Sequence, residues 1–443
     1  MNREVSSFLA TVCQEIKYKG VHKAISLELQ NHLDEIILAY LQKGISEEEA
    51  VKKALYQMGD PVKIGKSLDQ AHKPRTEGWL LALVATMIII GFGVVNALSY
   101  VTGSYITSAS LISYTMYLIV GLVVFIGCYF TDYTKLEKFS LPVFLSTVAL
   151  LFYYIKKGTY IYGIPQITIG SLSFNPTFIF LPIFLISFAG LLNRWANGKV
   201  MDMLKLLILG GIAVIACYVQ PSFVSAMLLT SGFIVTTTIA ILGKNFKGNK
   251  KKFLVALYGS ACFSFILIIL FLIRQGLRWY HLFPRLQHPA GRYVHQIALE
   301  LLTGARFIGE ANGLFVDNGF EKILRLPMAN GDFVFVYIVA AFGWVTGILV
   351  LIVLLTTILR MLATAMKIKT TYGKFLSSSI VTVFALQIIS NLLMNFGIFP
   401  NTGATIPFIS FGGSSFIANM ALVGFLLGIY RRKDMVLLVP SER

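Results

Sequence analysis

One aspartate in this chain stands where a carboxylate could take part in chemistry. Asp332 follows residues 326–331 and begins a long apolar run, which places it at the predicted edge of a membrane. Ionisable side chains at membrane depth are costly, so they are candidate functional groups. A carboxylate here could serve as a general base. A second interpretation is that Asp332 caps the following helix and complements its dipole.

A polar stretch interrupts the apolar pattern near the C-terminus. Prolines and glycines break helices there, and irregular backbone at membrane depth is tolerated only where protein buries it or where it lines a wet cavity. A lined cavity would offer hydroxyl and amide groups to a ligand, whereas close helix packing on small residues is the alternative interpretation. The candidate binding residues are Gln387, Asn391, Thr402, Ser410, Ser414 and Ser415.

The longest predicted loop, residues 274–331, offers cationic side chains. It is too apolar for a solvated tail, so we expect it to be ordered at the membrane surface. A guanidinium group can bind phosphate with two parallel hydrogen bonds, although arginines in such a loop are more often solvated or in contact with lipid headgroups. The candidate phosphate-binding residues are Arg285, Arg292, Arg306 and Arg325.

The composition predicts an integral membrane protein. Hydrophobic residues make up 56% of the 443 residues and charged residues only 13%, where a soluble protein has about 25% charged residues. Ten apolar segments are long enough to cross a bilayer as helices. We therefore expect an all-α, polytopic fold. The segments are 77–98, 111–130, 139–155, 175–193, 203–219, 223–243, 253–273, 332–358, 375–397 and 414–430.

The basic residues predict orientation and exclude nucleic acid as a partner. Lysine and arginine total 38 against 21 acidic residues, but they lie in short loops between apolar segments, where they set topology. Alternate loops hold fourteen basic residues, and the short loops on the other side hold only Lys156 and Lys157. Because basic loops stay inside, we expect both termini to be cytoplasmic and the 274–331 loop to be outside.

The first 75 residues are predicted to form a small soluble helical domain. Apolar positions recur at helical spacing from Ile25 to Tyr40, and Ser46 with Glu49 forms a predicted capping box. Asp60 and Pro61 then suit the start of a further helix. The segment lacks the continuous apolar core of a signal peptide, so we expect it to stay in the cytoplasm.

Neither the cysteines nor the histidines have the spacing of a metal site. The four cysteines are far apart and form no CxxC pair, so no disulfide framework or zinc site is predicted. His281, His288 and His295 recur every seven residues, which indicates one helical face more than a ligand set.

Residues 400–415, PNTGATIPFISFGGSS, resemble the signature of the SEDS family, the FtsW, RodA and SpoVE proteins. Leu326-Pro327 and the run from Gly331 to Phe335 are similar to the family's L-P-E-x-H-T-D-F-I-F segment, and the resemblance covers about residues 76–435. Residues 44–61 resemble a prefix domain found ahead of various Gram-positive membrane proteins. We expect that domain to be regulatory.

The resemblance implies a peptidoglycan glycosyltransferase in the bacterial cytoplasmic membrane. Such an enzyme polymerises lipid II at the outer face with a class B penicillin-binding protein, in division, cell-shape maintenance or sporulation. Asp332 matches the family's catalytic aspartate. The arginines would then stabilise a departing pyrophosphate. The resemblance implies no certain cofactor, and whether a divalent cation assists stays open.

Several charges of the family pattern are missing from this chain. Met328 replaces a glutamate, Asn330 a histidine, and Ala340-Ala341 a glutamate pair. Residues 175–178 read NPTF where the family has Q-P-S-E, and residues 220–222 read QPS where it has Q-P-D. The chain is thus a specialised paralogue or has lost polymerase activity. The alternatives are a transporter of lipid-linked precursor, which needs no base, and an inactive scaffold for a penicillin-binding protein.

The loop charges make the topology testable with reporter fusions. Reporters fused after Lys252 and after Lys369 should give a cytoplasmic signal, because basic loops are retained inside. A reporter near Asn318 should give an outside signal. An outside signal at Lys252 would contradict the orientation.

Overall fold

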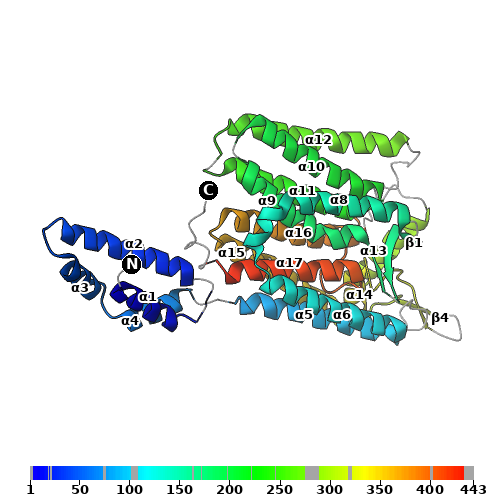
Figure 1. The fold of residues 1–443 in the computed structure, drawn as a ribbon. Helices are drawn as coiled ribbons and strands as arrows, with labels where there is room; N and C mark the ends of the chain where they lie inside the picture. Colours follow the sequence, from blue (N-terminus) through cyan, green and yellow to red (C-terminus); the bar gives the residue numbers. More distant parts are fainter. Residues whose placement is uncertain are drawn as a thin grey trace. The chain divides into compact units, whose positions relative to one another are not determined.

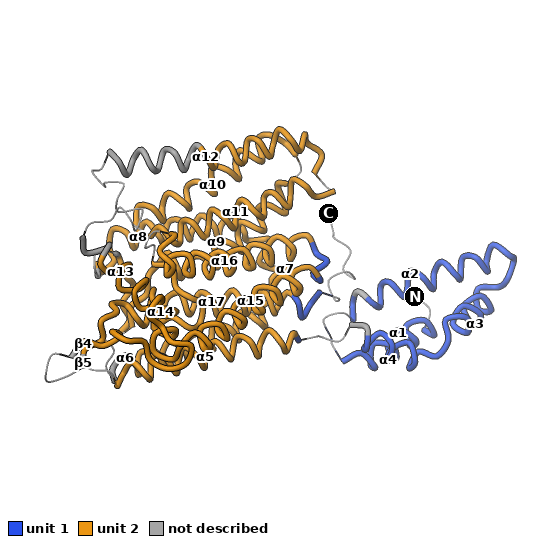
Figure 2. Tube along the Cα trace, turned by 180° about the vertical axis from the view of Figure 1, so that it is seen from behind, with its two compact units in different colours: residues 1–76, 367–370, 430–443 blue, residues 77–366, 371–429 orange. Residues whose placement is uncertain are grey.

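In the computed structural model the described residues are 3–17, 19, 22–72, 76–100, 108–161, 164–170, 172–196, 198–220, 222–244, 246–274, 289–317, 322–399 and 403–433. The chain divides into two compact units (Figure 2). One unit comprises residues 1–76, 367–370 and 430–443, and the other comprises residues 77–366 and 371–429.

The first unit contains four helices, α1 (Arg3–Glu15), α2 (His22–Leu41), α3 (Glu47–Met58) and α4 (Pro61–His72). α1 packs on α4 and α2 packs on α3. Their apolar faces meet in a small core that contains Val5, Leu9, Val12, Ile25, Leu33 and Val51.

Two predicted helix starts in this unit differ in outcome. Asp60 caps α4, because its Oδ1 accepts a hydrogen bond of 2.9 Å from the backbone N–H of Val62. Ser46 is the N-cap residue of α3, but its side chain makes no capping hydrogen bond, so the predicted capping box is wrong. Three glutamates in the first turn of α3 complement the helix dipole instead.

The second unit is a bundle of helices (Figure 1). Its helices are α5 (Gly78–Ser99), α6 (Ser108–Phe130), α7 (Tyr133–Leu136), α8 (Ser140–Lys157), α9 (Pro176–Trp195), α10 (Val200–Val219), α11 (Phe223–Leu242), α12 (Lys250–Arg274), α13 (Pro289–Thr303), α14 (Val334–Phe342), α15 (Trp344–Met366), α16 (Thr371–Asn395) and α17 (Gly413–Arg431). Within the described ranges, nine helices are long and apolar enough to cross a membrane. The prediction of a polytopic, mainly helical membrane protein is confirmed. The predicted segment 253–273 corresponds to α12, which has 25 residues.

Two small antiparallel sheets lie at one end of this bundle. Strands β1 (Thr159–Ile161), β2 (Ile164–Ile169) and β3 (Leu172–Phe174) form one sheet in that order, and β4 (Phe315–Asp317) pairs with β5 (Lys322–Leu324) in the other. The apolar periodicity of the sequence did not predict these hairpins, because they lie in connections between the long segments.

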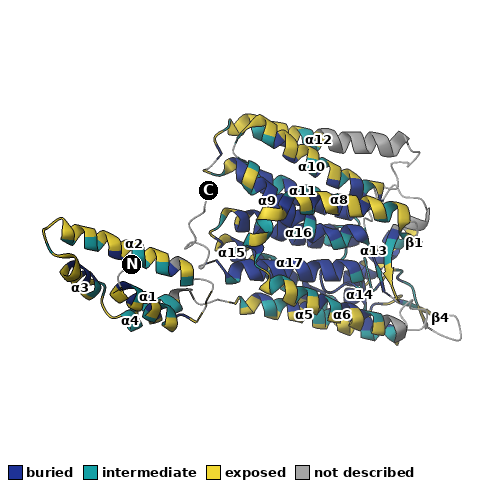
Figure 3. Cartoon of the chain, in the orientation of Figure 1, coloured by how far each residue is buried: buried dark blue, intermediate teal, exposed yellow. Residues whose placement is uncertain are grey.

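Burial separates the central helices from the peripheral ones (Figure 3). In the most apolar 18-residue stretch of α17, 89% is buried inside the protein. In the most apolar 18-residue stretch of residues 111–130 in α6, only 17% is buried. A helix that is apolar all round and buried occupies a core. α17 is therefore central, and the exposed apolar faces of peripheral helices such as α6 and α10 suit contact with lipid.

The predicted segment 332–358 is not one helix, so the prediction that Asp332 begins a membrane-spanning helix is wrong. α14 ends at Gly343, which has a φ of +95°, and the helix of spanning length is α15. The backbone of residues 306–308 packs against the chain at Gly343, and the N–H of Trp344 donates to Arg306 O at 3.0 Å. A Cβ at Gly343 would lie 2.6 Å from Phe307 O, so only glycine fits.

Candidate functional site

Asp332 lies in a tight turn that precedes α14. The backbone N–H groups of Gly331 and Phe333 both donate to Met328 O, at 3.0 and 3.3 Å, and Met328 has a positive φ of 52°. The N-cap residue of α14 is Phe333, which makes no side-chain capping bond. Among the described residues, the Asp332 carboxylate makes no helix-capping hydrogen bond, so the capping interpretation has no support in the geometry.

Two buried amides of α16 hold the Asp332 turn from one side. Nδ2 of Asn391 and Nδ2 of Asn395 donate to the main-chain oxygen of Asp332 at 2.9 and 3.0 Å. Asn391 also donates to Ala404 O, and Asn395 to Asn391 Oδ1. Both side chains are fully buried. The carbonyl of a membrane-edge turn is thereby satisfied by protein donors instead of water.

The segment between α16 and α17 holds the turn from the other side. Oγ of Ser410 donates to Gly331 O at 2.8 Å and accepts from the N–H of Ile406 at 2.9 Å. The N–H of Phe411 donates to Asn330 O at 2.7 Å. We call these contacts, together with those of Asn391 and Asn395, the Asp332 clamp.

The Asp332 carboxylate faces the backbone of Gly403. A Cβ at Gly403 would lie 3.9 Å from Oδ2 of Asp332. Burial raises the pKa of the Asp332 carboxyl from 3.8 to about 6. The structure places no Lys, Arg or His within salt-bridge distance of this carboxylate among the residues it describes. A carboxylate with a pKa near 6 is ionised at pH 7 yet more basic than a solvated one, which suits proton abstraction.

A second polar network continues beside the clamp. Nε2 of Gln387 donates to Thr405 Oγ1 at 3.1 Å, and Thr405 Oγ1 donates to Ser415 Oγ at 3.2 Å. Oγ of Ser414 accepts from the backbone N–H of Asn175 at 2.7 Å. These side chains bond to one another or to the backbone N–H of Asn175. Substrate binding by them stays a prediction.

The arginines predicted to bind phosphate are only partly described. Nη2 of Arg325 pairs with Oε2 of Glu300 at 2.6 Å, and Nη2 of Arg306 donates to Asn312 Oδ1 at 2.9 Å. Neither of these contacts reaches the Asp332 turn. Arg285, Thr402 and the side chain of Arg292 lie outside the described residues.

His295 is a site residue whose importance the sequence did not reveal. Its ring packs edge-on against Phe333, the neighbour of Asp332, with centroids 5.6 Å apart. The side chain is buried, and neither ring nitrogen has a hydrogen-bond partner in the described part of the chain. Burial lowers the pKa of His295, so the imidazole is neutral at pH 7. The seven-residue spacing predicted only a helical face; His281 and His288 lie outside the described residues.

Metal-binding geometry is absent from the described ranges. They contain no group of three or more His, Cys, Asp or Glu side chains that could hold a metal ion.

The clamp can be tested through stability. Asn391→Leu retains shape but removes the amide donor to Asp332 O and Ala404 O. An unsatisfied buried polar group costs about 1–3 kcal/mol, so the midpoint of thermal unfolding should fall. Thr382→Val in the same helix is the control, because Thr382 bonds only to Ser378 O one turn away. Equal midpoints for the two purified variants would contradict the clamp.

Comparison with known proteins gives the family. A family model described as cell cycle protein, comprising FtsW, RodA and SpoVE, matches residues 78–435. A probable peptidoglycan glycosyltransferase FtsW of Geobacter sp. (strain M18) is 25% identical over 81% of this chain and 98% of its own length. Stage V sporulation protein E of Bacillus subtilis (strain 168) is 31% identical over 27% of this chain. The chain matches about a third of the length of several relatives, including 32% of that protein.

Solved structures share the fold. A chain of a peptidoglycan synthase complex that coordinates polymerization and crosslinking gives a TM-score of 0.63 at 22% identity, covering 81% of this chain and 98% of that chain. The crystal structure of the Thermus thermophilus rod shape determining protein RodA gives 0.57 at 19% identity, covering 81% and 97%. The matched region includes Asp332 and every residue of its clamp. On the strength of that match, the chain belongs to the FtsW, RodA and SpoVE family of cell cycle proteins.

Proposed function

We propose that this protein is a peptidoglycan glycosyltransferase that polymerises lipid II. The observation that carries the proposal is Asp332, a carboxylate with a pKa raised to about 6 on a turn that is hydrogen-bonded from two sides. A partly desolvated carboxylate with no cationic partner among the described residues destabilises the folded state, so its presence favours a functional role. The name of one similar protein, a probable peptidoglycan glycosyltransferase FtsW, supports the same reaction.

The reaction forms one glycosidic bond and releases one pyrophosphate. The 4-hydroxyl of a GlcNAc attacks the anomeric carbon of a MurNAc, and the bond from that carbon to undecaprenyl pyrophosphate breaks with inversion. Asp332 accepts the hydroxyl proton as the new bond forms, which a base with a pKa near neutrality does efficiently. Arg306 and Arg325 are candidates to stabilise the departing pyrophosphate, because guanidinium groups match phosphate oxygens.

We also propose where this protein acts and which protein it acts with. Asp332 faces the outer surface of the bacterial cytoplasmic membrane, and both termini are cytoplasmic, because the basic loops lie on the side opposite the 274–331 loop. The partner is a class B penicillin-binding protein, which would crosslink the strands. Likeness to a chain of a peptidoglycan synthase complex supports this partner.

A transporter of lipid-linked precursor is the second candidate, favoured by the polar backbone between α16 and α17 at membrane depth. Transport requires no proton acceptor, so a neutral substitution of Asp332 would leave it intact. A scaffold for a penicillin-binding protein would likewise tolerate that substitution. In that case the native chain itself would not polymerise lipid II.

Asp332→Asn separates these functions. Asparagine retains the size of the side chain but cannot accept the proton, so production of glycan strands from lipid II should fall on the order of 10² to 10⁴-fold, the usual worth of a positioned base. The assay uses purified protein with and without a penicillin-binding partner, and strands are resolved on gels. Asp202→Asn is the control, because Asp202 pairs with Lys205 at the opposite end of the bundle. Near-normal polymerisation by Asp332→Asn would remove the base from the mechanism.

The pKa of Asp332 predicts the acid limb of the pH profile. Only the carboxylate form accepts a proton, so the rate should be constant above about pH 7 and fall about tenfold per unit below pH 6. The raised pKa means that the folded state binds this proton more tightly than the unfolded state. Asp332 therefore adds stability at low pH, which is lost as the pH rises through about 6. Unfolding midpoints measured at each pH separate loss of rate from loss of structure, and a flat rate from pH 7 to 5 would contradict the assignment.

A further inference from the structure

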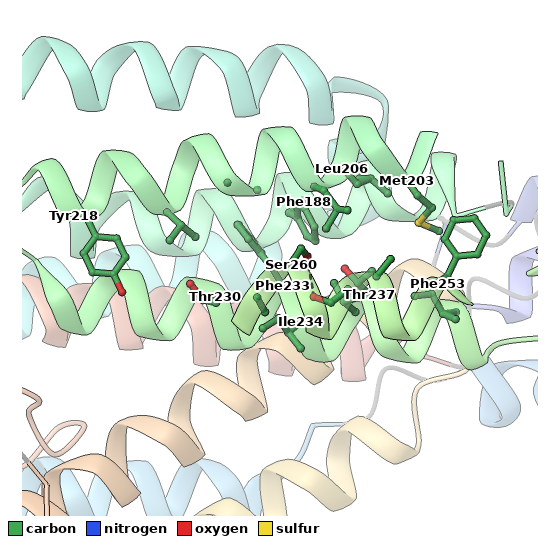
Figure 4. A pocket seen from close by; sticks show the side chains of 18 residues that line it. Phe188, Met203, Leu206, Tyr218, Thr230, Phe233, Ile234, Thr237, Phe253 and Ser260 are labelled. Carbon is green, nitrogen blue, oxygen red and sulfur yellow. Dashed lines mark hydrogen bonds between the residues drawn. The ribbon is translucent and has the colours of Figure 1, made fainter. Parts of the chain in front are cut away.

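An apolar crevice of about 220 Å³ lies between α10, α11 and α12 (Figure 4), and Asp332 is not among its lining residues. Side chains of all three helices line it, among them Met203, Tyr218, Phe233, Thr237 and Phe253. Met203 and Tyr218 are fifteen residues apart on α10. At 1.5 Å per residue the crevice follows about 22 Å of the helix, a length that suits a hydrocarbon chain.

The crevice exists because α12 is joined to the bundle through one neighbour. Among the helices, α12 shares a substantial interface only with α11 in the described part of the chain. Ala256 on α12 and Gly211 on α10 both line the gap and have small side chains or none. A Cβ at Gly211 would meet no atom within 4 Å. The space is therefore open among the residues that the structure describes.

Lysines lie in the two loops that adjoin one end of the crevice. Residues 196–205 and 243–253 contain seven lysines and one acidic residue, Asp202, which already pairs with Lys205 at 3.1 Å. Nζ of Lys250 donates to Leu242 O at 3.0 Å, which places this lysine at the end of α11 beside the lining residue Ile241. Lys251 and Lys252 are exposed on the first turn of α12, close in sequence to the lining residue Phe253.

The two lysine-bearing loops are held together by close contacts. Gly198 has a φ of +89°, and a Cβ there would lie 2.3 Å from Gly248 N, so the two backbones touch. Phe246 is buried, and its ring packs edge-on against Phe253 at 5.1 Å between centroids. The charged end of the crevice is thus a fixed feature. It lies away from α13 and β4 within this unit (Figure 1).

We propose that this crevice is a binding site for an anionic phospholipid. One acyl chain lies along α10 between α11 and α12, and the phosphate of the headgroup lies among Lys250, Lys251 and Lys252. The acyl contact alone would not select a lipid, because surrounding lipid tails are equally apolar. The lysines provide the selection, since basic clusters beside a membrane helix attract anionic headgroups.

The test compares retention of two phospholipids with the same acyl chains. Purified full-length protein is loaded with phosphatidylglycerol or phosphatidylcholine in detergent, washed, and the bound lipid is counted by native mass spectrometry. We expect one phosphatidylglycerol to be retained in preference, on the order of tenfold, because charge attraction acts only on the anionic headgroup. Equal retention of the two lipids would overturn the proposal.

Two pairs of variants locate the site. Gly211→Leu fills the crevice and should abolish retention, whereas Gly93→Leu on α5, where a Cβ also meets no atom within 4 Å, should not. The double variant Lys251→Gln, Lys252→Gln should remove the preference for phosphatidylglycerol, and Lys135→Gln, Lys138→Gln in another loop should preserve it. Retention by Gly211→Leu equal to that of Gly93→Leu would refute the location.

Competition with a polyprenyl phosphate tests whether the crevice binds a phospholipid or the tail of a polyprenyl substrate. If it fails to displace phosphatidylglycerol at matched concentration, the site is a phospholipid site as proposed. If it displaces phosphatidylglycerol and binds more tightly, the crevice is a tail site for a polyprenyl substrate and the proposal is wrong.

Discussion

The main-chain oxygen of Asp332 and its two asparagine donors set the geometry of the site. A turn at the edge of a membrane cannot rely on water to satisfy its backbone, so protein groups must do so. Asn391 and Asn395 satisfy this carbonyl from α16, and Ser410 satisfies the preceding one from the segment before α17. These bonds converge on the backbone and leave the carboxylate free to face Gly403.

That constraint explains why polar residues of the 387–415 stretch, such as Gln387, Asn391 and Ser410, are buried. The irregular backbone between the end of α16 and the start of α17 has N–H and C=O groups that need hydrogen-bond partners. Ser415 donates to the main-chain oxygen of Gly412 and is linked to Gln387 through Thr405 by side-chain hydrogen bonds. Ser414 separately accepts from the backbone N–H of Asn175, before α9. The polar stretch therefore joins α16 and the start of α17 to the Asp332 turn through hydrogen bonds.

Much of the fold could be predicted from the sequence because long apolar segments carry a strong signal. The break between α14 and α15 could not, because residues 334–358 are apolar throughout and the helix is interrupted by loop backbone that packs against Gly343. Asp332 could be found from its residue type and its place beside an apolar run. The burial of His295 against Phe333 could not, since a contact between distant segments leaves no local pattern.

Contacts between α9 and α11 show what replaces two of the charged residues of the family pattern. Thr177, Ser222 and Ser225 bond to one another at 2.9 Å, where the family pattern has charged residues at or beside the same positions. The neutral hydroxyls satisfy one another there, so this chain has no buried charge at Thr177, Ser222 or Ser225. Asp332 differs, because it has kept its charge without any described cationic partner. A chain selected only as a scaffold would gain stability by replacing that residue too. The retained carboxylate therefore favours an active enzyme over an inactive paralogue.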